Sequence, residues 1–166
     1  NYISKLIKAG KKVAICEQVE DPKFAKGIVK REVIKVITPG TVVDVNLLDD
    51  KSNNYIMSLV KKDNFIGLSV VDITTGESLL TEFEDNNSFS KLDNEIFKFR
   101  PSECIISDSD NLLSGILNKY EFVSLNKVES FSFEYNYARE TLISHFKVSS
   151  LAGFGIEELT YGVCAF

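Results

Sequence analysis

Three acidic side chains stand beside the most apolar strands that the sequence predicts, where carboxylates could bind metal ions. Asp72 ends one apolar run and precedes Ile-Thr-Thr-Gly, whereas Glu103 and Asp108 flank the short run CIIS. A two-metal nuclease needs several carboxylates that converge on metal ions about 3.5–4 Å apart. These residues therefore allow one catalytic hypothesis, a metal-dependent nuclease that uses Asp72, Glu103 and Asp108.

A structural interpretation of the same acids is favoured. Asp72 precedes the run TTG, where a carboxylate commonly closes a turn, and Asp108 belongs to the polar run SDSD, where it can cap the next helix. The sequence contains a single histidine, His145, so neither a histidine metal cluster nor Ser-His-Asp or Cys-His catalysis is expected. We therefore predict no catalytic residue and no metal site.

A basic strand near the N-terminus offers a second kind of chemistry, contact with phosphate. Residues 29–37 alternate in side-chain type, the period-two pattern of a β-strand, and Lys30 and Arg31 lie near its start. Residues 1–41 hold nine Lys and Arg against four Asp and Glu, a net charge of +5, whereas the rest holds ten against twenty, or −10. Only the N-terminal quarter is thus expected to approach a polyanion. The alternative is a solvated edge strand that its lysines protect from aggregation.

The composition excludes several classes of protein. With 166 residues, 44% hydrophobic and 26% charged, the chain fits one globular domain, or one domain and a fragment. No run approaches the roughly 18 apolar residues of a membrane span, and the first residues lack the apolar block of a signal peptide. Cys16, Cys104 and Cys164 stand apart in apolar settings, which indicates reduced core thiols in a cytoplasmic protein. The first residue is Asn, from which we expect an excised piece.

The N-terminal elements position the basic strand. Apolar residues at helical spacing predict the end of an amphipathic helix before Gly10, followed by a short strand at 13–18. Pro39 and Gly40 end the basic strand, because proline lacks the ladder donor and glycine permits a sharp turn. The polar, turn-rich stretch 42–53 is predicted to be a linker. Pro39 and Gly40 are therefore the expected hinge at a domain boundary.

From residue 54 the pattern becomes that of an α/β domain. Runs at 55–60, 66–73 and 77–83 predict an antiparallel β-meander. The later elements are a helix that ends before Pro101, a strand at 103–107, a helix capped by Asp110, a strand at 122–125, and a helix at 135–146 with Ala138, Leu142 and Phe146 inward. This order predicts a mixed sheet with helices packed on it, a ribonuclease H-like α/β arrangement.

Two later stretches complete the elements. Aromatic residues gather near the start of the last helix, and acidic neighbours disfavour base stacking there, so we predict core packing for Phe131, Phe133, Tyr135 and Tyr137. Gly153 and Gly155 predict a flexible hinge, after which residues 156–166 begin another helix.

Several motifs together resemble the MutS family of bacterial DNA mismatch repair proteins. They are VAICEQVEDP, KREVIKVITPGT, LLDDKSNNYIMSL, VVDITTGE, RPSECIIS and LAGFGIE, and they run in order over essentially the whole chain. The resemblance implies that residues 1–41 end a mismatch-recognition domain and that 42–53 are a linker. It further implies a ribonuclease H-like connector domain at 54–148 and the start of lever or core helices at 149–166.

The same resemblance implies a role without catalysis. The chain lacks the family's Phe-x-Glu wedge, clamp and ATPase motifs, so ATP and Mg²⁺ are expected in a C-terminal domain of the parent protein. Arg31 matches a recognition-domain arginine near the DNA backbone, and Lys30 is its neighbour. The implied partners are mismatched duplex DNA, MutL and a second copy of the parent, with no membrane. The implied location is the bacterial cytoplasm, at the nucleoid.

Overall fold

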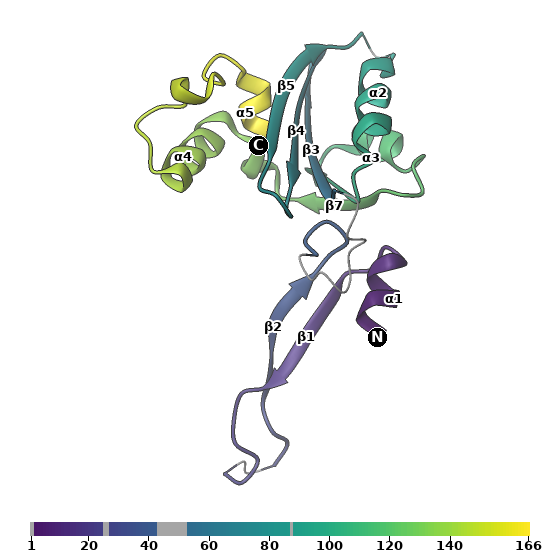
Figure 1. The fold of residues 1–166 in the computed structure, drawn as a ribbon, viewed down its shortest axis with the longest axis vertical. Helices are drawn as coiled ribbons and strands as arrows, with labels where there is room; N and C mark the ends of the chain where they lie inside the picture. The colour runs from purple at the N-terminus through teal and green to yellow at the C-terminus, as the bar shows by residue number, and fades with distance from the viewer. Residues whose placement is uncertain (1, 25–26, 43–52, 87) are drawn as a thin grey trace.

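A long β-hairpin carries the N-terminal part of the chain and projects from one end of a helix-covered sheet (Figure 1). The structure, a computed structural model, describes residues 2–24, 27–42, 53–86 and 88–166. Helix α1 (Tyr2–Lys8) lies beside the hairpin, whose antiparallel strands are β1 (Val13–Gln18) and β2 (Arg31–Ile37). We call residues 2–24 and 27–42 the hairpin unit; its helix and two strands confirm the predicted elements.

A small apolar core holds the hairpin unit together. Ile7 of α1, Ile37 of β2 and Val42 are buried against one another. Gly10 ends the helix with a positive φ of 71°, which explains why a glycine follows the last helical turn. By contrast, β2 is exposed at every position before Ile37, including three large apolar side chains, Val33, Ile34 and Val36. Most of this strand therefore contributes little to the core.

A five-stranded mixed sheet forms the second part. Its strands are β3 (Tyr55–Lys62), β4 (Phe65–Asp72), β5 (Ser78–Glu84), β6 (Glu103–Ser107) and β7 (Ser124–Val128). Their spatial order is β5-β4-β3-β6-β7, with the first three antiparallel and with β6 and β7 parallel to β3. The predicted meander and mixed sheet are confirmed. The last strand begins at Ser124, so the prediction of residues 122–125 was placed too early.

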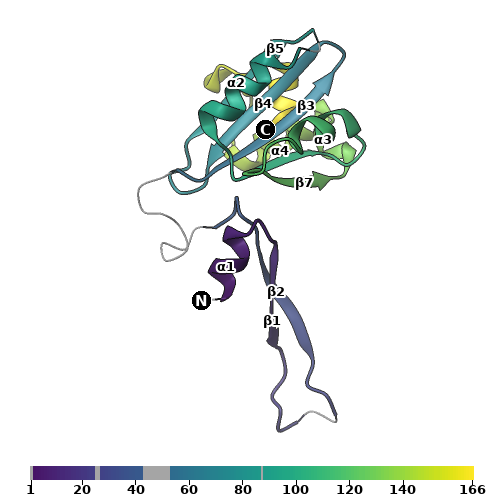
Figure 2. The ribbon, with the colours of Figure 1, turned by 90° about the vertical axis from the view of Figure 1, so that its right-hand side faces the viewer.

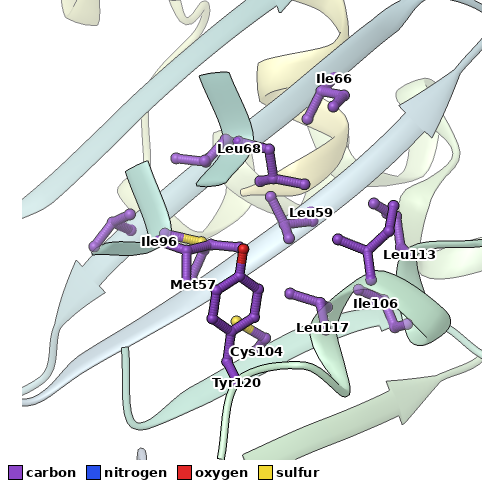
Figure 3. Packing of buried hydrophobic residues seen from close by; sticks show 13 residues of the cluster. Met57, Leu59, Ile66, Leu68, Ile96, Cys104, Ile106, Leu113, Leu117 and Tyr120 are labelled. Carbon is purple, nitrogen blue, oxygen red and sulfur yellow. The ribbon is translucent and has the colours of Figure 1, made fainter. Parts of the chain in front are cut away.

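Helices α2 (Ser90–Phe99) and α3 (Asn111–Leu117) cover one face of this sheet. Side chains alternate between the faces of a strand, so Met57, Leu59 and Leu68 all point to this side. Figure 3 shows them meeting Ile96 of α2 and, from the side of α3, Leu113 and Leu117. This cluster is the main hydrophobic core, and its burial is the main driving force for forming the domain.

On the opposite face, α5 (Thr160–Ala165) packs against β3, β4 and β5, and α4 (Tyr135–Phe146) packs on α5 (Figure 1). The sheet therefore has helices on both sides. The Ser69 hydroxyl donates to the carbonyl of Ala165 at 2.6 Å, which ties α5 to the central strand β4. A second apolar cluster includes Leu142, Leu151 and Val163. Helix α5 therefore packs on the sheet, although the predicted connector domain ended at residue 148.

Several side chains differ from their predicted burial. Phe146 was expected inward, yet it is 38% exposed, at the end of α4. Phe131 and Tyr137 were predicted to be core residues, and each is about half exposed, at 51% and 50%; they contact each other edge to face instead. Cys16 is exposed on β1, so only Cys104 is a fully buried thiol. Cys16 does not belong to the small core of the hairpin unit, on which Val13 and Ile15 of the same strand pack.

The predicted linker is described only at its ends. Residues 43–52 lie outside the described part of the chain, so the linker remains a prediction. At one end, Val42 is 2% exposed and belongs to the core of the hairpin unit. At the other end, Asn54 is buried just before β3. In the view of Figure 2, the hairpin unit lies below the sheet at the edge where β3 begins.

Candidate functional site

The three acids of the nuclease hypothesis do not share a face of the sheet. Asp72 pairs with Tyr55, and their side chains share the face of Met57 and the α2–α3 core. Glu103 pairs with Ile56, one position along β3, so its side chain lies on the opposite face. Two metal ions about 4 Å apart cannot be held from both sides of a sheet.

Asp108 lies at yet another place. It follows the last residue of β6, whereas Glu103 is the first residue of that strand. Its carboxylate accepts a hydrogen bond from the Ser130 hydroxyl at 2.9 Å. Within residues 2–24, 27–42, 53–86 and 88–166, no group of three His, Cys, Asp or Glu side chains is arranged to hold a metal ion. The geometry speaks against the nuclease hypothesis.

Of the two aspartates predicted to cap a helix, Asp108 and Asp110, only one caps α3. Asp110, not Asp108, caps α3, because its carboxylate accepts from the Leu113 N–H at 2.8 Å. The capping role predicted for Asp110 is confirmed, and the one predicted for Asp108 was wrong.

Asp72 closes a turn, as predicted. Its Oδ1 accepts from the Thr74 N–H at 2.9 Å and from the Thr74 hydroxyl at 2.7 Å. Burial raises the pKa of this carboxyl, but hydrogen bonds from Thr74 and Thr75 outweigh burial, and the net pKa is lowered. The carboxylate therefore shapes the connection between β4 and β5, and its charge is stabilised there.

Lys30 and Arg31 lie at the start of β2, the end of that strand that is far from the sheet (Figure 1). Both are exposed. The Lys30 ammonium forms an ion pair with Glu32 at 2.6 Å, and the Lys30 N–H donates to Glu20 at 2.6 Å. Acidic neighbours thus reduce the positive field at Lys30, whereas Arg31 presents its guanidinium on the open strand. Their contact with a DNA backbone remains a prediction.

Residues 38–41, Thr-Pro-Gly-Thr, form a tight turn that we call the boundary turn. The Thr41 N–H donates to the Thr38 carbonyl at 3.2 Å, the bond that closes a β-turn. The Thr38 N–H donates to the Thr41 hydroxyl at 2.9 Å, and the two hydroxyls lie 2.9 Å apart. Pro39 occupies the second position, where its fixed φ suits the turn. Hydrogen bonds between Thr38 and Thr41 thus close the turn.

Gly40 brings the boundary turn directly onto the sheet. A Cβ at this position would lie 2.6 Å from Cγ1 of Ile56, 2.8 Å from Cβ of Glu103 and 2.9 Å from its Oε2. Gly40 does not have a positive φ. Glycine is therefore required here by space and not by backbone conformation. The predicted hinge residues Pro39 and Gly40 do lie at a contact between the two parts, and hinge motion there remains a prediction.

Two buried polar side chains hold this turn. Glu103 is 1% exposed, and its Oε2 accepts from the Gly40 N–H at 3.1 Å. Asn54 is 4% exposed, and its Nδ2 lies 3.2 Å from the Pro39 carbonyl, 3.0 Å from that of Gly40 and 3.4 Å from that of Val42. The sequence singled out Glu103 only as a metal ligand and did not single out Asn54. A signal was present, since both polar residues directly adjoin buried strands.

The second predicted hinge lies in a short 3-10 turn, η2 (Ala152–Phe154), between anchored ends. Gly155 has a positive φ of 71°, which favours glycine, and Gly153 also lies in this segment. Just before the turn, the N–H of buried Leu151 donates to Glu157 at 2.7 Å. The hydrogen bond from Arg139, at 2.9 Å, lowers the pKa of Glu157. The hinge role of Gly153 and Gly155 remains a prediction.

Two family models match two successive parts of the chain. Residues 1–46 match the family model for MutS domain I, and residues 54–166 match that for MutS domain II. The second match extends through α5, in agreement with the packing of that helix on the sheet. Among the described residues, no helix has both the length and the apolar character needed to cross a membrane.

Relatives named DNA mismatch repair protein MutS match nearly the whole chain. The protein of Ruminiclostridium cellulolyticum is 48% identical over 91% of the chain, and that of Lachnoclostridium phytofermentans is 46% identical over 99%. The protein of Methanococcoides burtonii is 45% identical over 97% of the chain. The chain spans only 18% of the length of each of these relatives. On these matches, the chain belongs to the MutS family of DNA mismatch repair proteins, of which it covers domains I and II.

Proposed function

We propose that this chain is the non-catalytic connecting part of a mismatch repair protein. It would join the DNA-contacting domain I to the motor domains of a longer MutS protein. The observation that carries this proposal is the packing of the boundary turn, which belongs to the segment matched to domain I, on β3 and β6 of the segment matched to domain II. A joint that is packed in this way can pass a displacement from one domain to the next.

The sheet topology supports the connector assignment. Numbered along the sheet domain, its strands lie in the order 3-2-1-4-5, with strands 1, 4 and 5 parallel. The order agrees with the ribonuclease H-like arrangement that the sequence predicted for a MutS connector, and it supports that part of the proposal. The carboxylates that would make such a sheet a nuclease lie on opposite faces and at different strand ends, which favours a mechanical role.

The partners follow from the same proposal. The basic hairpin unit would contact the backbone of mismatched duplex DNA through Arg31 and, more weakly, Lys30, and the connector would offer a docking surface to MutL. ATP and Mg²⁺ would bind to another domain of the parent, which would act as a homodimer in the bacterial cytoplasm at the nucleoid. A phosphate contact fixes position without reading sequence, so mismatch recognition would also lie elsewhere in the parent.

A chimeric protein tests this function. The chain replaces its matching residues in the Ruminiclostridium cellulolyticum MutS, and repair is scored in cells that lack their own MutS. We expect the chimera to restore repair, since the chain would supply both the joint and the partner surface. Loss of repair by a folded chimera that still binds mismatched DNA and ATP would refute the connector role.

A pull-down with MutL tests the docking part. The 166-residue chain and a version without residues 1–41 are compared as bait. Equal capture by both baits is expected, because docking is proposed on the sheet domain. Capture that depends on residues 1–41 would move the surface to the hairpin unit, and no capture by either bait would refute docking on this chain.

A further inference from the structure

The Glu103 carboxylate lies between the two domains with a hydrogen-bond donor at each oxygen. The Gly40 N–H donates to Oε2 at 3.1 Å, and the Asn126 side-chain amide donates to Oε1 at 3.0 Å. Each partner is a neutral donor. A carboxylate is the side chain that accepts at both oxygens, whereas a glutamine would turn its own NH₂ toward one of the two donors. The site therefore requires an acid rather than any polar residue of this size.

Asn54 complements Glu103 on the same turn. Glu103 satisfies the donor of Gly40, and the Asn54 amide satisfies the carbonyls of Pro39 and Gly40. The Asn54 Oδ1 in turn accepts from the Ser102 hydroxyl at 2.6 Å. Asn54 and Ser102 directly precede the neighbouring strands β3 and β6. The boundary turn is thus held from the starts of two paired strands.

A second point of attachment lies on β7. The Lys12 ammonium donates to the Oδ1 of Asn126, whose amide nitrogen donates to Glu103. Lys12 stands just before β1 and Gly40 just after β2, so the two attachments hold both strands of the hairpin at their sheet end. Two points of attachment restrict the orientation of the hairpin more than a single point would.

We propose that Glu103, together with Asn54, is a positioning residue that locks the angle between domain I and domain II. This inference rests on the proposed connector function and names the residues through which it would work. The closed joint is a defined state, because the hydrogen bonds of Glu103 and Asn54 to the boundary turn must break before the turn can leave the sheet. Domain movement would then switch between a locked and a released joint instead of sliding through intermediate angles.

Glu103→Gln is the sharpest test in the 166-residue chain, since it keeps the volume and removes one acceptor. Exchange of the Gly40 amide proton is followed by NMR, with Leu68 in the buried centre of β4 as the internal reference. We expect Gly40 to exchange about tenfold faster or more while Leu68 is unchanged. Glu84→Gln, on an exposed side chain of β5, is the matched control and should alter neither amide.

Pulsed electron spin resonance measures the angle itself. One label is placed on exposed Cys16 of β1 and the other on Lys119→Cys, in a Cys164→Ser background. A narrow distance distribution is expected for the native joint, and a broad one for Glu103→Gln. Asn54→Ala, which loosens the turn without altering Glu103, should broaden it as well and serves if Glu103→Gln folds poorly.

The inference would be overturned if Gly40 exchange and the distance distribution both stayed native in Glu103→Gln or in Asn54→Ala. Equal acceleration of Gly40 and Leu68 in both variants would also overturn it, because the residues would then support only general stability. The proposed function fails by a different result, loss of repair by the chimera with the unaltered chain. The two failures are therefore distinguishable.

Discussion

Gly67→Ala should detach α5 from the sheet or strain the contact severely. An added Cβ would lie 1.9 Å from the carbonyl oxygen of Tyr161, 2.2 Å from its carbonyl carbon and 2.9 Å from the nitrogen of Gly162. All three are backbone atoms, so a change of side-chain rotamer cannot relieve the overlap. Non-bonded atoms need about 3.5 Å, so α5 must move by roughly 1.5 Å.

The cost of that movement follows from what holds the helix. Glu82 accepts from the N–H groups of Tyr161 at 2.7 Å and Gly162 at 3.2 Å, and Ser69 donates to Ala165 at 2.6 Å. Three hydrogen bonds at about 1 kcal/mol each give about 3 kcal/mol. Overpacking a core with extra methyl groups typically costs about 1–3 kcal/mol. Whether the helix detaches or the contact is strained, the free energy of unfolding should therefore fall by about 1–3 kcal/mol.

Urea unfolding followed by circular dichroism measures this change. Gly115→Ala is the matched control, because a Cβ at this position of α3 meets no atom within 4 Å. Alanine is the better helix former, so the control should gain about 0.5–1 kcal/mol. A loss below about 0.5 kcal/mol for Gly67→Ala, with amides of α5 still protected, would refute the close packing of α5 on the sheet.

Three further predictions concern single side chains. Asp110→Ala should lower the free energy of unfolding by about 1 kcal/mol, because α3 loses its cap, whereas Asp108→Ala should change it by less than about 0.5 kcal/mol. Equal losses for the two variants in urea melts would contradict Asp110 as the cap of α3. Asp72→Asn should lower the free energy of unfolding by a constant amount above pH 3.8, the usual pKa of this carboxyl. The loss should shrink as the pH falls through the lowered pKa of the folded protein, because the native Asp72 then also becomes neutral. A loss that is the same at every pH would argue against a charged Asp72 in the folded protein. Arg31→Ala should reduce the slope of log binding constant against log salt concentration, measured with duplex DNA, by about one unit. Lys30→Ala should reduce it by less, because Glu32 pairs with Lys30, and the control Lys119→Ala should leave it unchanged. Identical slopes for all three variants would contradict a DNA contact of the hairpin unit.

Local sequence patterns predicted the helices and strands well where the side chains follow a single helical or strand period. Strand β1 and helix α4 begin and end at the residues that their alternation and helical spacing indicated. Asp110 was found from its place before an apolar helix. The start of β7 was misplaced by two residues, because Phe122 and Val123 look like strand residues yet pack beside the main core. Short-range sequence patterns therefore predict which elements form better than they predict the residues at which those elements begin and end.

Contacts between distant residues could not be predicted in the same way. Gly40 and Glu103 are 63 positions apart, and Ser69 and Ala165 are 96 apart. Glu103 was noticed for its charge, but its role depends on the parallel pairing of β6 with β3, which places it on the face opposite Asp72. The sequence also gave no reason to expect that Gly67 and Gly40 are required for space. Such roles arise only when the sheet is assembled.

The most direct test of the connector account measures release from DNA in the chimeric MutS. The native chain is compared with Gly40→Ala, which forces the boundary turn off Ile56 and Glu103, and with Glu84→Gln as control. Binding of a mismatched duplex should be similar in all three, because no DNA contact is changed. ATP-triggered release should slow by about fivefold or more in Gly40→Ala alone, the scale of a coupling free energy of about 1 kcal/mol. Native release by a Gly40→Ala chimera with a displaced turn would contradict the claim that this joint couples the domains.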